Sequence, residues 1–154
     1  NEYFSRMVPI VFAHRGTVDK FVGDMIMALF GAPLDDADHA DHAVQTALAM
    51  SAALGQLNHE WRAQGRPALD AGVGINTGEM VAGNLGSEDI MSYTVIGDHV
   101  NLGARLESLT KEFHTRIIVS ESTVAANDTS GFPRVFASRS GVIRPSSCPS
   151  PGRP

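Results

Sequence analysis

The segment Lys20-Phe21-Val22-Gly23-Asp24 combines residue types that could bind a charged ligand. Gly23-Asp24 separates two short apolar runs, which predicts a hairpin with the Asp24 carboxylate at its tip. A carboxylate beside a glycine can hold a hard cation. Regular alternation would place Lys20 on the same side of the strand as Val18 and Val22. A lysine among apolar neighbours either extends its charge to water or donates to a ligand acceptor. This segment alone leaves both interpretations open.

A second cluster lies between Thr94 and Arg105. Asn101 and Arg105 are four residues apart, so a helix would place them on the same face. Arginine is suited to clamp a phosphate, and asparagine could fix a ribose. The alternative is an ordinary polar helix face, with Arg105 paired to Glu107 or Glu112.

Two other patterns are typical of structure rather than of chemistry. Gly72, Gly74 and Gly78 do not have the spacing of a dinucleotide-binding fingerprint, and no helix start follows them, so strand and turn positions are expected. His39 and His42 lie among several aspartates, which could suggest a metal site. Acidic residues are also favoured at the start of a surface helix, and this second interpretation is the stronger one.

The elements that must position these residues follow from hydrophobic periodicity and turn residues. Helices are expected at 2–14, from the aspartates at 35–38 to Gly65, at 99–110 with Asp98 as the N-cap, and from Ser120. Strands are expected at 17–22, 25–30, 71–76, 80–82, 90–96 and 116–119, with 77–78 joining two of them and a turn at 84–87. This order predicts an α+β domain with antiparallel hairpins and helices on one side of the sheet.

Composition limits the class of protein. Of the 154 residues 43% are apolar but only 6% are aromatic, so aliphatic side chains, alanine and methionine must fill the core. The net charge is −5 and no local basic run occurs, so nucleic acid is not an expected partner. No apolar stretch approaches the roughly 20 residues of a membrane span. Cys148 is the only cysteine, which excludes an internal disulfide and fits a reducing compartment.

Taken together, four segments of the chain resemble the class III nucleotide cyclase catalytic domain, in order from about residue 1 to residue 125. These segments are 20–24, 31–33 (Gly-Ala-Pro), 72–78 (Gly-Val-Gly-Ile-Asn-Thr-Gly) and 93–107 (Tyr-Thr-Val-Ile-Gly-Asp-His-Val-Asn-Leu-Gly-Ala-Arg-Leu-Glu). We therefore predict a partial cyclase domain at 1–130. Residues 131–154 are rich in Ser, Pro and Arg and are predicted to form a disordered tail.

The resemblance implies a ferredoxin-like α+β fold and a homodimer with active sites shared across its interface. It implies an adenylate cyclase that converts ATP to 3′,5′-cyclic AMP and pyrophosphate, assisted by two Mg²⁺ or Mn²⁺ ions. By resemblance, Asp24 binds metal, and Lys20 and Thr94 read the purine. Asn101 would orient the ribose, and Arg105 would stabilise charge on the α-phosphate.

The pair that reads the purine favours ATP. Adenine offers a hydrogen-bond donor at N6 and an acceptor at N1, which suit a threonine acceptor and a lysine donor, whereas guanine reverses this pattern. In the family that the chain resembles, guanylate enzymes usually carry glutamate at the position of Lys20. The family's first metal-binding aspartate has no counterpart here, and its final strands are replaced by the Ser/Pro/Arg-rich segment. We expect an incomplete domain of a longer, cytoplasmic signalling protein.

Two alternatives to a cyclase stay open. One is a catalytically inactive cyclase-homology module for dimerisation or nucleotide sensing. The other is a metal-dependent nucleotide-binding domain with different chemistry.

Overall fold

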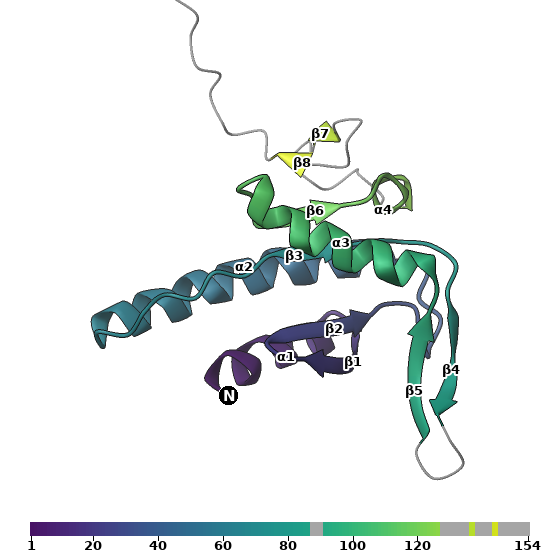
Figure 1. The fold of residues 1–154 in the computed structure, drawn as a ribbon, viewed down its shortest axis with the longest axis horizontal. Coiled ribbons are helices and arrows are strands. Elements are labelled where there is room, and N and C mark those ends of the chain that lie inside the picture. The colour runs from purple at the N-terminus through teal and green to yellow at the C-terminus, as the bar shows by residue number, and fades with distance from the viewer. Residues whose placement is uncertain (87–90, 127–135, 138–142, 145–154) are drawn as a thin grey trace, which may run out of the picture.

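The computed structural model describes residues 1–86, 91–126, 136–137 and 143–144. Its elements follow the predicted order (Figure 1). They are α1 (Glu2–Ala13), β1 (Thr17–Val22), β2 (Met25–Leu29), α2 (His39–Ala63), β3 (Val73–Ile75), β4 (Val81–Gly86), β5 (Met91–Ile96), α3 (Asp98–Glu112), β6 (Ile117–Val119), α4 (Glu121–Ala126), β7 (Phe136–Ala137) and β8 (Ile143–Arg144). The predicted α+β class is therefore confirmed.

The strands of the described part pair two by two. β1 and β2 form an antiparallel hairpin, β4 and β5 form a second one, and β7 pairs with β8. β3 pairs in parallel with β6. Figure 1 shows the β4–β5 hairpin extending away from the helices.

The expected pattern of antiparallel hairpins does not extend to β3. This strand pairs with β6, and α3 lies between β5 and β6 in the chain. Parallel neighbours need a long crossover connection, and the stretch that contains α3 supplies one. The turn predicted at 84–87 is also wrong in its first part, because residues 84–86 continue β4 opposite β5.

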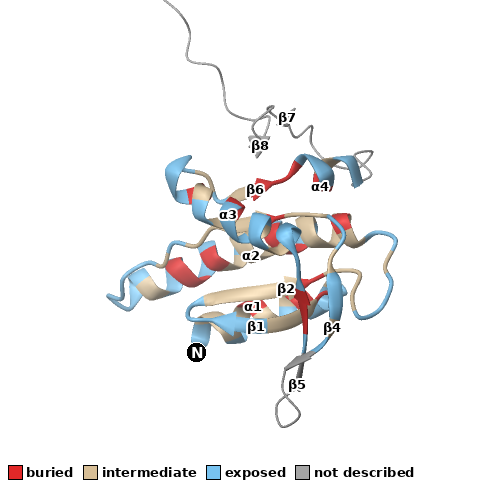
Figure 2. Ribbon diagram, turned by 45° about the vertical axis from the view of Figure 1, so that its right-hand side comes forward, coloured by how far each residue is buried: buried red, intermediate tan, exposed pale blue. Residues whose placement is uncertain are grey.

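The core lies between α1, α2 and the strands that they cover. Met7 and Val11 from α1 are buried, as are Leu54 and Leu57 from α2. Figure 2 shows buried residues along α2, on β6 and on parts of α3, with exposed residues on the outer sides of the helices. All apolar side chains found buried in the described part are aliphatic residues, alanine or methionine, as the composition predicts.

Polar contacts at the surface fix α1 against α2. Arg6 forms a two-pronged ion pair with Glu60, with nitrogen–oxygen distances of 2.8 and 3.1 Å. Trp61 and Arg66 both donate to the Glu2 carboxylate, at 3.0 and 2.8 Å. Helix α1 thus keeps a defined position although Pro9 lies inside it.

Most of the predicted tail at 131–154 lies outside the described residues, apart from β7 and β8. Among the helices of the described part, none is both long and apolar enough to cross a membrane.

Candidate active site

Asp24 lies at the tip of the β1–β2 hairpin, as predicted. Val22 pairs with Met25, so Gly23 and Asp24 alone form the turn. Gly23 has a φ of +62°, a conformation that glycine adopts without strain. The Asp24 residue is exposed and available to a ligand.

The hairpin tip lies near the first turn of α1. The rings of Phe4 and Phe21 have centroids 4.8 Å apart. Burial raises the pKa of Tyr3, and the negative charge of Asp24 raises it further. The Asp24 carboxylate is therefore close enough to influence the α1 side chains.

A β-bulge in β1 reorganises the residues beside Lys20. The strand register shifts between Val18 and Lys20, so Asp19 is the extra residue. A bulge redirects side chains that regular alternation would send to opposite faces. The expectation that Lys20 shares a face with Val18 assumed regular alternation, and the bulge makes it wrong.

Asp19 connects the two residues that we predicted to read the purine. Thr94 Oγ1 donates a hydrogen bond to Asp19 Oδ2 at 2.9 Å, although 75 positions separate the two residues. Lys20 Nζ lies 3.4 Å from the same oxygen. The Asp19 side chain is 1% exposed, whereas that of Lys20 is 45% exposed. The ammonium group can therefore reach a ligand while it stays beside the carboxylate.

Sequence reasoning missed Asp19. The available signal was a carboxylate directly before Lys20 in a strand that is otherwise mostly apolar. Alternation would have placed Asp19 on the opposite face from Lys20, so only the bulge reveals their shared direction.

Helix α3 carries Asn101 and Arg105 on its exposed surface. The helix begins at Asp98, and its N-cap is Gly97 rather than the predicted Asp98. Gly97 has a φ of +144°, which only glycine adopts readily, and this turn connects Thr94 on β5 to the helix.

Close packing fixes the distance between α3 and β3. A Cβ atom on Gly74 would lie 2.3 Å from the backbone nitrogen of Glu107 and 2.4 Å from the carbonyl oxygen of Gly103. Asn76 also donates to the carbonyl oxygen of His99, at 2.8 Å. The glycines at 72, 74 and 78 are thus packing positions, in agreement with the strand-and-turn interpretation.

No ion pair to Glu107 or Glu112 holds Arg105 in the described part of the chain. The side chain borders a shallow depression on α3 together with Ser108 and Glu112. The alternative of an ordinary ion-paired helix face therefore loses its main support.

The structure brings Lys20 and Thr94 together through Asp19, but it does not link the other predicted residues to them by any described hydrogen bond or ion pair. Asp24 follows Lys20 by four residues, and Gly23 and Asp24 form the turn after the strand. The roles of all five residues, those of Lys20 and Thr94 included, stay predictions.

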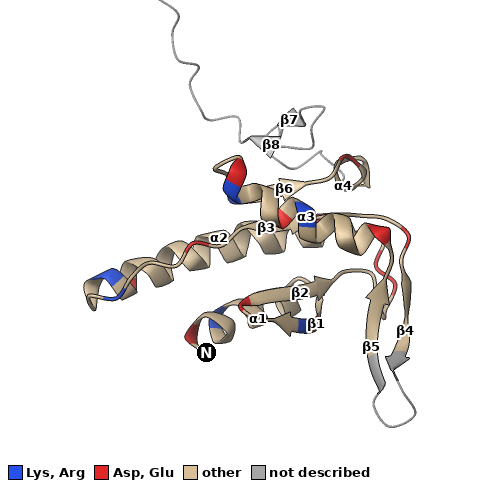
Figure 3. Cartoon of the chain, in the orientation of Figure 1, with Lys and Arg blue, Asp and Glu red and all other residues tan. Residues whose placement is uncertain are grey.

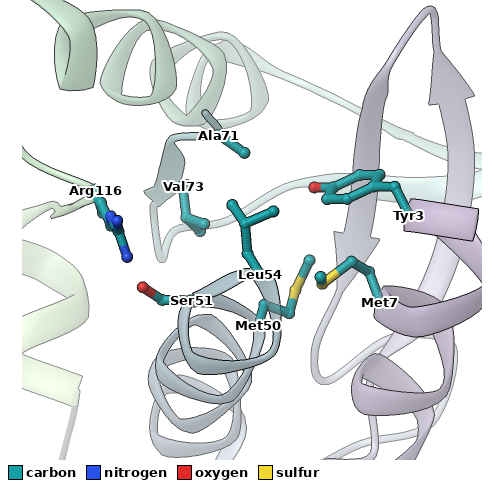
Figure 4. Close-up of a pocket in the computed structure, with 8 residues that line it drawn as sticks. All are labelled: Tyr3, Met7, Met50, Ser51, Leu54, Ala71, Val73 and Arg116. Carbon is teal, nitrogen blue, oxygen red and sulfur yellow. The ribbon is translucent and has the colours of Figure 1, made fainter. Parts of the chain in front are cut away.

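A small, partly open cavity lies between α1, α2 and β3, and none of these residues lines it. Figure 4 shows its lining, which includes Tyr3, Met7, Leu54 and Val73. Its volume is about 10 Å³, close to the minimum that one water molecule needs. It is too small for a nucleotide.

His39 and His42 belong to the start of α2. His42 Nδ1 lies 2.6 Å from Asp36 Oδ2, and this hydrogen bond is the main reason why the pKa of Asp36 lies below its usual 3.8. His39 Nδ1 lies 2.9 Å from the carbonyl oxygen of Asp36. The described residues contain no group of three or more potential metal-binding side chains.

The Asp24 carboxylate is nevertheless a suitable ligand for Mg²⁺ or Mn²⁺. Both ions prefer carboxylate oxygens, and Mg²⁺ takes only one or two carboxylates when phosphate oxygens and water complete its shell. An exposed carboxylate at a hairpin tip offers one such ligand.

Known proteins of one family resemble this chain over most of its length. Residues 1–142 match the family described as the adenylate and guanylate cyclase catalytic domain. The chain belongs to this family. The resemblance noted from the sequence motifs and the expected cyclase fold are thereby confirmed.

Adenylate cyclase 1 of Rhizobium meliloti (strain 1021) is 39% identical over 125 residues, which cover 81% of this cyclase chain and 19% of that protein. The chain spans about a fifth to a quarter of the curated relatives that it matches.

Among solved structures, the guanylyl cyclase Cya2 matches with a TM-score of 0.75 and 38% identity, over 92% of this chain and 72% of that one. The adenylyl cyclase CyaB from P. aeruginosa matches with a TM-score of 0.74 and 38% identity, over 82% and 65% respectively. Relatives of both base specificities are thus equally similar, and the base must be argued from the site itself.

Proposed function

We propose that this cyclase domain converts ATP to 3′,5′-cyclic AMP and pyrophosphate. The observation that carries the proposal is the convergence of Lys20 and Thr94 on Asp19 from segments far apart in the sequence. A lysine donor and a threonine hydroxyl at one place give the two polar groups that a purine edge needs.

Adenine fits this pair better than guanine. Lys20 can only donate a hydrogen bond, which suits the N1 acceptor of adenine. Thr94 can accept from the N6 amino group. Guanine presents an N1–H donor to the lysine, so one hydrogen bond would be replaced by two opposed donors.

Arg105 and Asn101 supply the polar groups for the reaction centre. The ribose 3′-oxygen attacks the α-phosphorus and loses its proton, a new P–O bond forms, and the bond from the α-phosphorus to the bridging oxygen breaks to release pyrophosphate. Asn101 orients the ribose by hydrogen bonding. The Arg105 guanidinium, which no described ion pair neutralises, stabilises the negative charge that develops on the α-phosphate.

Asp24 would hold a divalent metal ion, Mg²⁺ or Mn²⁺, in contact with the phosphates. When bound, such an ion lowers the pKa of a coordinated hydroxyl and neutralises phosphate charge. The contribution of the chain is one exposed carboxylate whose position the two-residue turn fixes.

A homodimer would complete the site, with Asp24 of one protomer facing Lys20, Thr94, Asn101 and Arg105 of its partner. The cavity of Figure 4 is lined by none of the predicted residues, and the depression beside Arg105 is lined by Arg105 alone among them. Large apolar side chains are also exposed on β1, β4 and β5: Phe21, Val22, Val81 and Ile96. A second copy of the chain could cover these side chains and bring Asp24 to the site.

The test is to incubate the purified chain with ATP and Mn²⁺ or Mg²⁺ and to quantify cyclic AMP. We expect product from the wild type, assayed with its natural upstream segment restored if the 154 residues alone form none, and no product from Lys20→Ala or Asp24→Ala in the same background. The matched controls are Lys111→Ala and Asp35→Ala, which remove the same charges at exposed positions outside the proposed site. Binding of ATP without product would instead support the nucleotide-sensing module.

A further inference from the structure

Asp19 lies at the centre of the purine-reading pair but has no role in the function described so far. Its carboxylate is almost fully buried, and it accepts the Thr94 hydroxyl hydrogen at 2.9 Å. Lys20, 3.4 Å away, supplies the counter-charge. Figure 3 shows basic residues widely spaced over the fold, and Lys20 is the only basic residue of β1. Thr94 and Lys20 thus contact the same oxygen of Asp19, and the three residues are called the Asp19–Lys20–Thr94 cluster below.

We propose that Asp19 is a positioning residue that determines base specificity by fixing the direction of the Thr94 hydrogen bond. This inference rests on the proposed function, since it assumes that Thr94 faces the purine.

The number of available protons sets the direction of each hydrogen bond in the cluster. A threonine hydroxyl has one hydrogen to donate and two lone pairs, whereas a carboxylate only accepts. Since Thr94 gives its hydrogen to Asp19, only its lone pairs remain for a ligand. The same carboxylate holds the Lys20 ammonium, a pure donor, beside the hydroxyl. The cluster thus presents one acceptor and one donor in a fixed order.

That order matches only one purine. Adenine pairs its N6–H with the Thr94 acceptor and its N1 with the Lys20 donor. Guanine offers its O6 acceptor to a hydroxyl whose hydrogen is already used. If Asp19 did not accept from Thr94, the hydroxyl could rotate and donate to O6. Asp19 therefore excludes guanine without touching the base.

The decisive variant is Asp19→Asn, which keeps the size of the side chain but adds a donor. Its amide can donate to Thr94, which releases the hydroxyl hydrogen toward the ligand. We expect the ratio of ATP to GTP affinity, measured by equilibrium binding with Mn²⁺, to fall about tenfold or more, which corresponds to about 1.4 kcal/mol. The ratio of cyclic AMP to cyclic GMP formed should fall in parallel.

Two further variants separate specificity from folding. Thr94→Val should lose the same preference as Asp19→Asn, and the double variant should lose no more, because both act through one hydrogen bond. Thr46→Val is the matched control. It removes another buried threonine hydroxyl, which donates to the His42 carbonyl oxygen at 2.7 Å, and it should leave the ATP-to-GTP ratio unchanged.

The outcomes distinguish the two proposals. If the wild type prefers ATP but a folded Asp19→Asn variant keeps the same ratio, the role of Asp19 is refuted and the proposed function stands. If the wild type binds neither nucleotide, or both equally, then the proposed ATP specificity and the role of Asp19 both fail. If Asp19→Asn does not fold, Thr94→Ser and Thr94→Val decide. The proposal is supported if Thr94→Ser keeps the preference for ATP over GTP and Thr94→Val loses it. It is overturned if the two variants have the same ratio of ATP to GTP affinity.

Discussion

Replacing Gly74 with alanine tests whether the contact between β3 and α3 positions the helix that carries Asn101 and Arg105. The added Cβ would meet the α3 backbone at 2.3 Å from Glu107 and 2.4 Å from Gly103. Reaching an ordinary contact of 3.4 Å requires a shift of about 1 Å, and because these are backbone atoms no side chain can rotate away. Helix α3 must therefore retreat from β3.

The expected effects concern both stability and turnover. Overpacking of this kind costs about 1–3 kcal/mol of the free energy of unfolding. For a domain of this size, a cost of about 2 kcal/mol lowers Tm by about 4–8 °C. A displacement of about 1 Å at Asn101 and Arg105 should lower kcat for cyclic AMP formation by up to about 100-fold.

Gly55→Ala is the matched control, because the same atom is added where nothing lies within 4 Å. Gly55 lies inside α2, where alanine favours the helix by about 0.8–1 kcal/mol, so Tm should rise. Thermal unfolding followed by circular dichroism and a cyclic AMP assay measure both variants. A Gly74→Ala protein with the Tm and kcat of the wild type would refute the close packing of α3 on β3.

Three further predictions concern other parts of the chain. Arg105→Ala should lower kcat by about 10²–10³-fold with little change in KM, because its charge acts in the transition state, as steady-state kinetics would measure. Asn58→Ala should lower the free energy of unfolding by about 2 kcal/mol, measured by urea denaturation, because it removes two 2.8 Å hydrogen bonds to the backbone of Leu69. Asp36→Asn should lower Tm near neutral pH. The hydrogen bond to His42 lowers the pKa of Asp36 in the folded protein. The ionised carboxylate therefore stabilises the fold at pH values above the pKa that Asp36 has in the unfolded chain. The difference in Tm should shrink as pH falls below about 4, because protonation of Asp36 removes this stabilisation.

Controls for these variants lie close by in the sequence. Lys111→Ala removes a different exposed charge from α3 and should keep kcat. Gln56→Ala alters an exposed position of α2, and Asp35→Asn alters an exposed aspartate beside Asp36, so both should leave stability almost unchanged. Equal loss in kcat and affinity for Arg105→Ala would contradict its transition-state role. A pH-independent difference in Tm for Asp36→Asn would contradict the pKa argument.

The order of the elements could be predicted from the sequence because the signals are local. Apolar residues at helical spacing mark α1 and α2, and Gly23-Asp24 between apolar runs marks the β1–β2 turn. The glycines at 72, 74 and 78 were assigned to strand and turn positions because their spacing fits no dinucleotide-binding fingerprint, and the structure adds that they are sites of close packing. The family motifs are local too, and so they identified the cyclase domain.

Other features depended on contacts that no local signal encodes. The parallel partner of β3 depends on where the chain returns after α3, so the expected antiparallel arrangement failed there. The start of α3 shifted by one residue because the positive φ of Gly97 ends β5 and begins the helix. Both features, the partner of β3 and the first residue of α3, depend on the backbone conformation of the folded chain.

The sequence by itself determined the family, the order of elements and the residue types available for chemistry. Only the tertiary structure decided that Asp19, Lys20 and Thr94 form one cluster. The physical reason is the bulge in β1, which cancels the alternation of a regular strand and turns Asp19 toward Lys20. The fold then brings β5 alongside, so that a hydroxyl 75 positions away donates to the buried carboxylate.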